Sequence, residues 1–136
     1  MTKQQLDQLS FSIIGAAIEV HKHIGPGLLE SAYQKCLKRE FELREIEFIS
    51  EFSITLSYKG FEFENDFRCD FYIENSLIIE IKAVNEIAPI HEAQLLNYMN
   101  LLKSPKGILI NFNCKNIFQE GQKTYVNEFY SKLPRF

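Results

Sequence analysis

The sequence predicts an α/β domain in which a mixed central sheet is flanked by helices. Two observations carry this prediction: some stretches space their apolar residues as helices do, and others show the alternating or continuous apolar patterns of strands. They follow the order helix, helix, three or four strands, helix, strand and a candidate last strand, which fits neither an all-α nor an all-β domain. The length of 136 residues fits one domain spanning residues 1–136.

The chain is predicted to begin with two helices. Apolar residues at helical spacing favour a first helix over residues 2–23, with Thr2 and Gln5 matching a capping box. Gly25-Pro26-Gly27 should end this helix, because glycine permits positive φ and proline disfavours helical backbone in the residue before it. The same spacing predicts a second helix over residues 28–43.

The rest of the chain alternates between strand and helix patterns. A helix is predicted over residues 91–103, with Leu95, Leu96, Met99 and Leu102 on its apolar side. Because a strand pattern stands on either side of this helix, residues 77–112 should form a right-handed parallel crossover. Strands are predicted over residues 52–58, 61–64, 67–73, 77–83 and 107–112, with a candidate last strand over 124–130.

Composition narrows the classes of function. An apolar content of 46% excludes intrinsic disorder, and no apolar run reaches the ~18 residues that a membrane-spanning helix needs. The first residues lack the apolar core of a signal peptide, so we expect a cytoplasmic protein with no membrane partner. A net charge of −3 is not that of a protein that holds nucleic acid by charge alone. A nucleic-acid partner would therefore require a local basic patch or a bound metal.

Several familiar chemistries are not indicated by the sequence. Cys36, Cys69 and Cys114 are odd in number and widely spaced, which fits neither a disulfide framework nor a zinc site. We expect all three to be reduced and mostly buried. The sequence also lacks a Walker-type phosphate loop, a GxGxxG motif and a GxSxG nucleophile elbow.

Two charged residues interrupt the most apolar of the predicted strands. Glu80 and Lys82 are two residues apart, so they point to the same face, and a hairpin at residues 74–76 would bring Asp70 beside Glu80. Buried charges need a partner or a metal, and Mg²⁺ takes one or two carboxylates together with water and phosphate oxygens. This pattern predicts a Mg²⁺ site at Asp70 and Glu80, where Lys82 positions or deprotonates a water molecule. The alternative is a Glu80–Lys82 ion pair at a solvated sheet edge.

Two further groups of residues each share a helix face. Glu30 and Tyr33 are three apart at the start of a helix, where the helix dipole favours an anion. His91, Gln94 and Tyr98 form one polar stripe, in which Gln94 is a candidate to orient water or contact a phosphate. The alternatives are a surface glutamate with a tyrosine at the core edge, and a solvated helix face.

Motifs along most of the chain resemble one known family. The run from Gly15 to Tyr33 is similar to the signature of the small prokaryotic GxxExxY proteins, which are placed in the PD-(D/E)XK nuclease superfamily. The resemblance extends from Ile13 to Phe112. Further motifs follow in the order that the family shows: Asp70, Glu80-Ile81-Lys82, the helix segment from Ala93 to Tyr98, and the strand from Gly107 to Phe112.

The resemblance implies a restriction-endonuclease-like αβββαβ core with a Mg²⁺ site at one end of the sheet, where Mn²⁺ is an alternative metal. Asp70 and Glu80 would be metal ligands, Glu30 would add a carboxylate to the metal or its waters, and Lys82 would lie next to the attacking water. The remaining candidates are Gln94 as a catalytic residue, and Tyr33, His91 and Tyr98 in substrate binding or support.

Two positions depart from the pattern of that superfamily. Cys69 stands before Asp70 where the superfamily has the proline of its name, and residues 122–125 lack an arginine expected in the last strand.

The first hypothesis is a Mg²⁺-dependent nuclease that hydrolyses phosphodiester bonds, in DNA rather than RNA. The second is a catalytically silent module of the same fold that binds nucleic acid or protein, favoured by the acidic net charge. A third is a homodimeric component of a larger complex.

Overall fold

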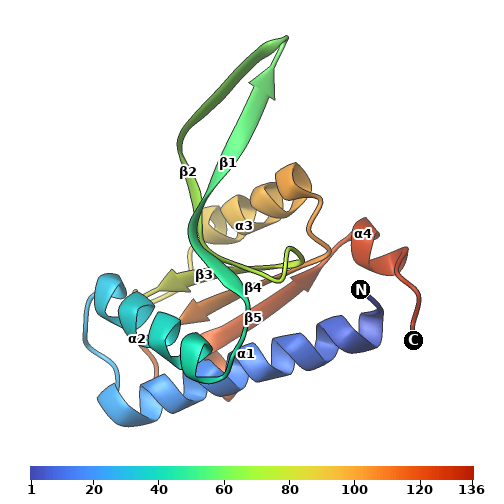
Figure 1. The fold of residues 1–136 in the computed structure, drawn as a ribbon. Coiled ribbons are helices and arrows are strands. Elements are labelled where there is room, and N and C mark those ends of the chain that lie inside the picture. The colour runs from blue at the N-terminus through green and yellow to red at the C-terminus, as the bar shows by residue number, and fades with distance from the viewer.

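A computed structural model shows one five-stranded sheet with helices on both faces (Figure 1). It describes the backbone of residues 1–136 and the side chains of residues 1–64 and 67–136. The strands β3 and β4 run parallel, and each of the other neighbouring pairs is antiparallel, so the predicted mixed sheet is confirmed. The spatial order follows the chain: β1 (Phe48–Tyr58), β2 (Phe61–Ile73), β3 (Leu77–Lys82), β4 (Lys106–Asn111) and β5 (Gln122–Val126).

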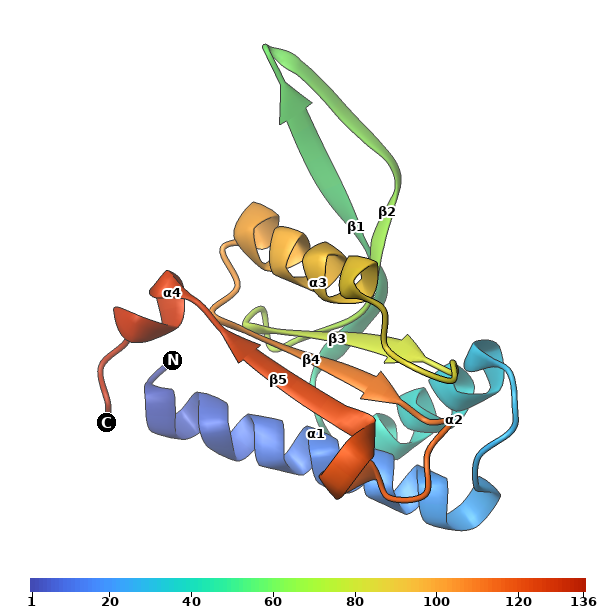
Figure 2. The same ribbon diagram turned by 180° about the vertical axis from the view of Figure 1, so that it is seen from behind.

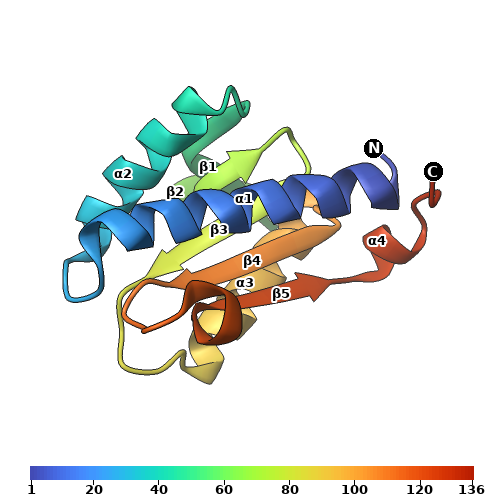
Figure 3. The same cartoon turned by 90° about the horizontal axis from the view of Figure 1, so that it is seen from below.

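The longer helices divide between the two faces of the sheet. Helices α1 (Lys3–Ile24) and α2 (Glu30–Leu43) cover one face, and α3 (Pro89–Leu102) covers the other (Figures 2 and 3). Because α3 joins β3 to β4, the predicted parallel crossover is confirmed. A single π-helical turn, η1 (Ile117–Gly121), precedes β5, and the short α4 (Glu128–Ser131) follows it. In the part of the chain that the structure describes, no helix combines the length and apolarity of a membrane span.

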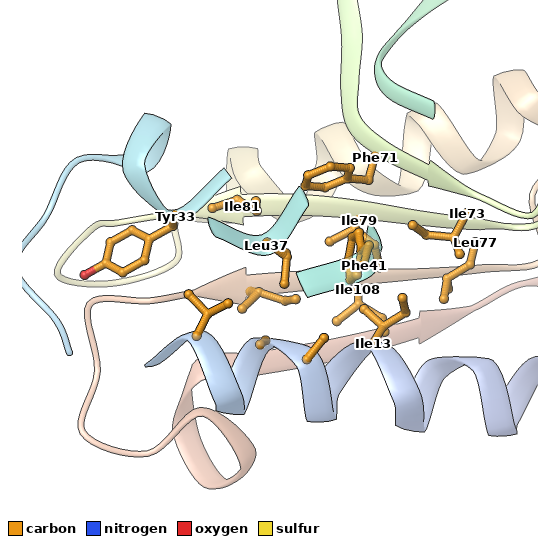
Figure 4. Close-up of a cluster of buried hydrophobic side chains, with 14 of the residues drawn as sticks. Ile13, Tyr33, Leu37, Phe41, Phe71, Ile73, Leu77, Ile79, Ile81 and Ile108 are labelled. Carbon is orange, nitrogen blue, oxygen red and sulfur yellow. The ribbon is translucent and has the colours of Figure 1, made fainter. Parts of the chain in front are cut away.

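The sheet separates two hydrophobic cores. The larger core lies between the sheet and the pair α1 and α2, and its side chains include Ile13, Leu37 and Ile79 (Figure 4). The smaller core lies under α3 and includes Ile78 and Leu109. Neighbouring residues of β3 thus enter different cores, as the period of two requires. This explains why a strand covered on both faces reads as a continuous apolar run.

Helix α3 packs very closely on β4. A Cβ atom added at Gly107 would lie 2.8 Å from both Leu95 Cδ1 and Met99 Sδ. Real Cβ atoms essentially never approach a neighbour so closely. Glycine at this position is therefore required by the short distance between the helix and the strand.

The hairpin of β1 and β2 continues far beyond the rest of the sheet and projects away from the body of the molecule (Figures 1 and 2). Residues 55–67 of this projection are referred to below as the arm. At the base of the arm both strands change the face on which they pack. Phe48 and Phe71 join the larger core, whereas Phe52 and Cys69 join the smaller one. The change occurs at Glu51, which has a φ of 51°.

Several predicted boundaries are wrong. Residues 61–64 and 67–73 belong to one continuous strand, β2, and β1 begins at Phe48, where aromatic packing on Phe41 and Phe71 holds it. The second helix begins at Glu30 rather than at residue 28. The predicted strand over 124–130 ends at Val126, because the Asn127 side chain accepts hydrogen bonds from the backbone of residues 129 and 130 and starts α4.

Other local predictions are confirmed. Thr2 and Gln5 form the capping box at the start of α1, with hydrogen bonds of 2.9 and 3.1 Å. The three cysteines are free thiols, as predicted, but the predicted burial holds for Cys69 alone, since Cys36 and Cys114 are only half-buried.

Candidate functional site

Four of the predicted residues meet at one end of the sheet, where β3 ends, β2 bends and α2 begins (Figure 1). The Ala83 amide, directly after β3, donates to Glu30 Oε1 at 3.4 Å. The charge of Glu30 raises the pKa of Asp70, and that of Lys82 lowers it. The pKa of Glu80 is raised by the charge of Asp70 and lowered by that of Lys82. The fold therefore gathers Glu30, Asp70, Glu80 and Lys82 into one polar cluster.

The bend in β2 determines how Asp70 is used. The ladder between β2 and β3 ends at the pair Phe71 and Ile79, one residue before Asp70 would face Glu80. Asp70 Oδ2 instead accepts a hydrogen bond of 2.7 Å from the Ile81 amide, so a carboxylate replaces the departing strand as partner of β3. Burial raises the pKa of Asp70, and the hydrogen bond from Ile81 opposes this increase.

Glu80 is the most unusual group of the cluster. Its side chain is 4% exposed, and among the described side chains Glu80 Oε1 and Ser10 Oγ are the buried polar atoms that lack a hydrogen-bond partner. Burial raises the pKa of Glu80 to about 9, and the neighbouring Asp70 charge adds to this, while Lys82 acts in the opposite direction. A buried carboxylate oxygen without a partner requires an explanation, because such atoms are rare in native proteins.

A divalent cation fits this arrangement. The Asp70 charge raises the pKa of Glu80, and a positive charge beside the two carboxylates would oppose this increase. Hard cations prefer such oxygen ligands. Within the described residues, no three His, Cys, Asp or Glu side chains are arranged to hold a metal ion together. Mg²⁺ nevertheless commonly takes only one or two carboxylates from a protein, and Asp70 and Glu80 provide two. Glu30 is exposed and lies beside them with its contact to Ala83.

Tyr33 holds the start of α2 against the sheet. Its fully buried ring stacks on Phe112, with 4.5 Å between centroids and an interplanar angle of 9°. Its hydroxyl donates to Gly25 O at 2.6 Å and accepts from the Leu28 amide at 3.2 Å. These contacts fix the loop that leads into α2, and with it the helix turn that carries Glu30.

The predicted polar stripe of α3 is only partly correct. Tyr98 is 5% exposed and packs in the smaller core, whereas Leu96, predicted on the apolar side, is 40% exposed. Burial raises the pKa of Tyr98, and the charges of Glu80 and Asp70 raise it further. The helix is rotated so that Tyr98 lies beside Leu95 and Met99, because a tyrosine ring buries a large apolar surface.

The other two residues of that stripe have different surroundings. Gln94 is exposed and lines a cavity that it shares with Tyr98. His91 Nδ1 accepts a hydrogen bond of 3.0 Å from the Ala88 amide and thereby caps the start of α3. Among the described side chains, no observed contact links His91 to the carboxylate cluster. The hydrogen bond that His91 accepts from Ala88 has a structural role.

One buried residue of this end was missed by the sequence interpretation. Asn111, at the end of β4, is 7% exposed and pairs in register with Lys82. Its Oδ1 accepts from the Val84 amide at 3.1 Å, and its Nδ2 donates to Val84 O at 2.9 Å. Asn111 thus fixes the chain as it leaves β3. An asparagine at the end of an otherwise apolar strand was the available signal.

Comparison with known proteins identifies the family and a similar fold. A family model described as the PD-(D/E)XK nuclease superfamily matches residues 7–124. A solved structure described as "Crystal structure of SSO0001" has a similar fold, with a TM-score of 0.52, 20% identity, and coverage of 75% of this chain and 55% of that one. The present chain therefore spans about half of that structure, and likeness at this identity shows the fold alone. None of the curated proteins matches.

The two findings settle the fold and the family. The similar solved structure and the family model both agree with the predicted restriction-endonuclease-like arrangement of a mixed sheet flanked by helices. The family match includes every residue of the carboxylate cluster and Tyr98. The chain belongs to the PD-(D/E)XK nuclease superfamily.

Proposed function

We propose that this chain is a Mg²⁺-dependent nuclease of the GxxExxY group, which hydrolyses phosphodiester bonds in nucleic acid, in DNA rather than RNA. The observation that carries the proposal is the pair of the half-buried Asp70 and the buried Glu80, in which Glu80 Oε1 has no hydrogen-bond partner. Membership of a nuclease superfamily supports the same chemistry. Mn²⁺ offers similar chemistry with oxygen ligands and is the alternative metal.

Each residue of the cluster has a role in this proposal. Asp70 and Glu80 hold the metal, and Glu30 adds a carboxylate to the metal or to its waters. When bound, the metal would supply a water molecule of lowered pKa and stabilise negative charge on the phosphate. Lys82, on the same strand face as Glu80, orients that water and takes part in its deprotonation. Gln94 contacts the substrate from α3.

A polar groove beside the cluster supports a nucleic-acid substrate in spite of the acidic net charge. It runs between α2 and β1 and has a volume of about 230 Å³. Lys35 and Lys38 provide two positive charges against the single carboxylate of Glu51. Such local positive charge attracts a phosphodiester backbone even when the whole protein is acidic.

The tip of the arm supports the predicted homodimer. Tyr58 and Phe61 are 62% and 65% exposed there, and exposed aromatic groups are enriched at interfaces between proteins. Sedimentation velocity at high protein concentration tests this part of the proposal. A monomer under those conditions would argue against it.

The substitution Asp70→Asn tests the metal site with little disturbance of the fold. Asparagine can still accept the hydrogen bond from the Ile81 amide, but it carries no charge. We expect calorimetric Mg²⁺ binding to disappear and cleavage of fluorescent DNA and RNA substrates to fall at least about 100-fold, since even groups outside the ligand sphere typically account for 10- to 100-fold effects. Circular dichroism should be unchanged.

Glu42→Gln is a matched control, because Glu42 is an exposed carboxylate of α2 near the end remote from Glu30. It should bind Mg²⁺ and cleave as the wild type does. Cleavage by Asp70→Asn at the wild-type rate with the same metal would contradict the proposed mechanism. Metal binding by the wild type without cleavage of any substrate would instead favour the silent binding module.

A further inference from the structure

A cavity of about 390 Å³ lies between the base of the arm and α3. Leu56 of β1 and Phe67 of β2 form its wall on the hairpin side. The wall on the helix side comes from Ile90, Gln94, Asn97 and Tyr98. Figure 2 shows α3 lying alongside the hairpin where it leaves the sheet.

The cavity adjoins the carboxylate cluster through Tyr98. This side chain lines the cavity, and its pKa is raised by burial and by the charges of Glu80 and Asp70. Tyr98 also packs in the same core as Cys69, the residue directly before Asp70. Tyr98 therefore belongs both to the lining of the cavity and to the groups whose pKa the carboxylates raise.

The lining chemistry narrows the class of ligand. None of the described side chains that form the cavity carries a charge, which disfavours a phosphate group as its occupant. Most of the wall is apolar, yet Gln94 and Asn97 place two amides, each with donors and an acceptor, on one face of α3. The ligand should combine flat apolar faces with a polar edge, as a nucleobase does. The volume lies within the range of about 300–1,000 Å³ of ligand pockets.

We propose that this cavity receives one unstacked nucleobase of the strand being cut, and that the substrate is therefore single-stranded or locally unpaired nucleic acid. The inference rests on the proposed function and names the substrate class of that site. Phe67 and Leu56 contact the face of the base, and Asn97 and Gln94 hydrogen-bond its edge. A base in a continuous duplex is stacked and paired, so it has to leave the helix to enter the cavity.

Binding of oligonucleotides to the Asp70→Asn protein in EDTA tests the inference without cleavage. The probes are one fluorescein-labelled DNA strand, the same strand in a duplex, and a single strand that contains 2-aminopurine. We expect the single strand to bind about ten-fold more tightly than the duplex, in line with the contribution of base contacts to aromatic and apolar side chains. The 2-aminopurine fluorescence should rise on binding as the base leaves its neighbours.

Two further substitutions locate the bound base. Asn97→Ala removes an amide from the cavity, and Ala93→Phe fills the cavity from an exposed position of α3. We expect each to weaken single-strand binding about ten-fold. Asn100→Ala is the matched control, because Asn100 is an exposed asparagine of the same helix and does not line the cavity. Its affinity should equal that of the parent protein.

Three results would overturn the inference: equal affinity for single strand and duplex, no effect of Ala93→Phe on the 2-aminopurine signal, or equal affinities of the Asn97 and Asn100 variants. These failures are distinguishable from a failure of the proposed function. A wild-type protein that binds Mg²⁺ and cleaves DNA, but shows none of the cavity effects, would keep the nuclease function and lose the base pocket.

Discussion

One charged residue is buried at each end of the central strands β3 and β4, but the two residues differ in their hydrogen-bond partners. Lys106 begins β4 and is 7% exposed, and its Nζ donates to Asp7 Oδ1 at 2.8 Å. The Tyr130 hydroxyl donates to the same carboxylate at 3.0 Å. At the other end Glu80 is 4% exposed, its Oε1 has no partner, and its nearest charged neighbours include another carboxylate.

Other polar groups at the Lys106 end also form hydrogen bonds. Ser104 Oγ donates to Ser76 O at 2.6 Å, and Asn127 Nδ2 donates to Ser104 O at 2.9 Å. These hydrogen bonds link the segments that precede β3 and β4 to the start of α4. Burial of a charge is thus common to both ends, and the difference lies in whether its hydrogen-bonding capacity is met. An unmet capacity at a buried carboxylate points to a ligand.

The largest expected effect is the pH dependence of stability caused by Glu80. Its pKa of about 9 in the folded protein exceeds its ordinary value of 4.5, so the folded state binds more protons than the unfolded state between these values. The free energy of unfolding of the metal-free protein should therefore be highest below pH 4.5 as far as Glu80 is concerned. It should fall as the pH rises towards 9, by at most about 1.4 kcal/mol per pH unit.

Urea unfolding in EDTA at a series of pH values measures this effect in the wild type and in Glu80→Gln. Glutamine stays neutral and keeps the shape of the side chain, so the variant should lose most of the decline between pH 5 and pH 9. Addition of Mg²⁺ should stabilise the wild type more at high pH, because binding requires the ionised carboxylate. Parallel pH profiles of the two proteins would show that Glu80 is not the group responsible.

A smaller effect, on stability alone, is expected from Lys106→Met. Methionine keeps the apolar stem but removes the ammonium group that bonds to Asp7. Because Asp7 is half-exposed and can be hydrated, the unfolding free energy should fall by only about 1–2 kcal/mol. Chemical denaturation and the cleavage assay measure the two properties side by side. Loss of cleavage in a folded Lys106→Met protein would mean that the two ends are coupled after all.

The smallest effect is expected from Tyr33→Phe. Phenylalanine retains the stack on Phe112, but the hydrogen bonds to Gly25 and Leu28 are lost, which should lower the unfolding free energy by about 1 kcal/mol. The affinity for Mg²⁺ should weaken a few-fold if Glu30 contributes, because the turn that carries Glu30 is held by these bonds. Calorimetry with Glu30→Gln as a parallel variant decides this, and unchanged affinity in both would remove Glu30 from the metal site.

Local sequence signals predicted the parts of the site that depend on local geometry. The hairpin at residues 74–76 and the period of a strand were enough to place Asp70, Glu80 and Lys82 together. The bend at Glu51 was not predictable in the same way, because a positive φ at a glutamate results from the packing of two strands on different cores. The burial of Tyr98 likewise depends on the rotation of α3 over the sheet, which no spacing within the helix specifies.

The distance between α3 and the sheet depends on the absence of a side chain at Gly107. At Gly107 the helix rests on bare backbone, and even a methyl group would have to push Leu95 and Met99 outwards. Tyr98 lies between those two residues on the helix, so it would be lifted away from Glu80 by the same movement. The absence of a side chain at Gly107 thus lets α3 approach the sheet closely, and a larger residue there should change the position of Tyr98 relative to Glu80.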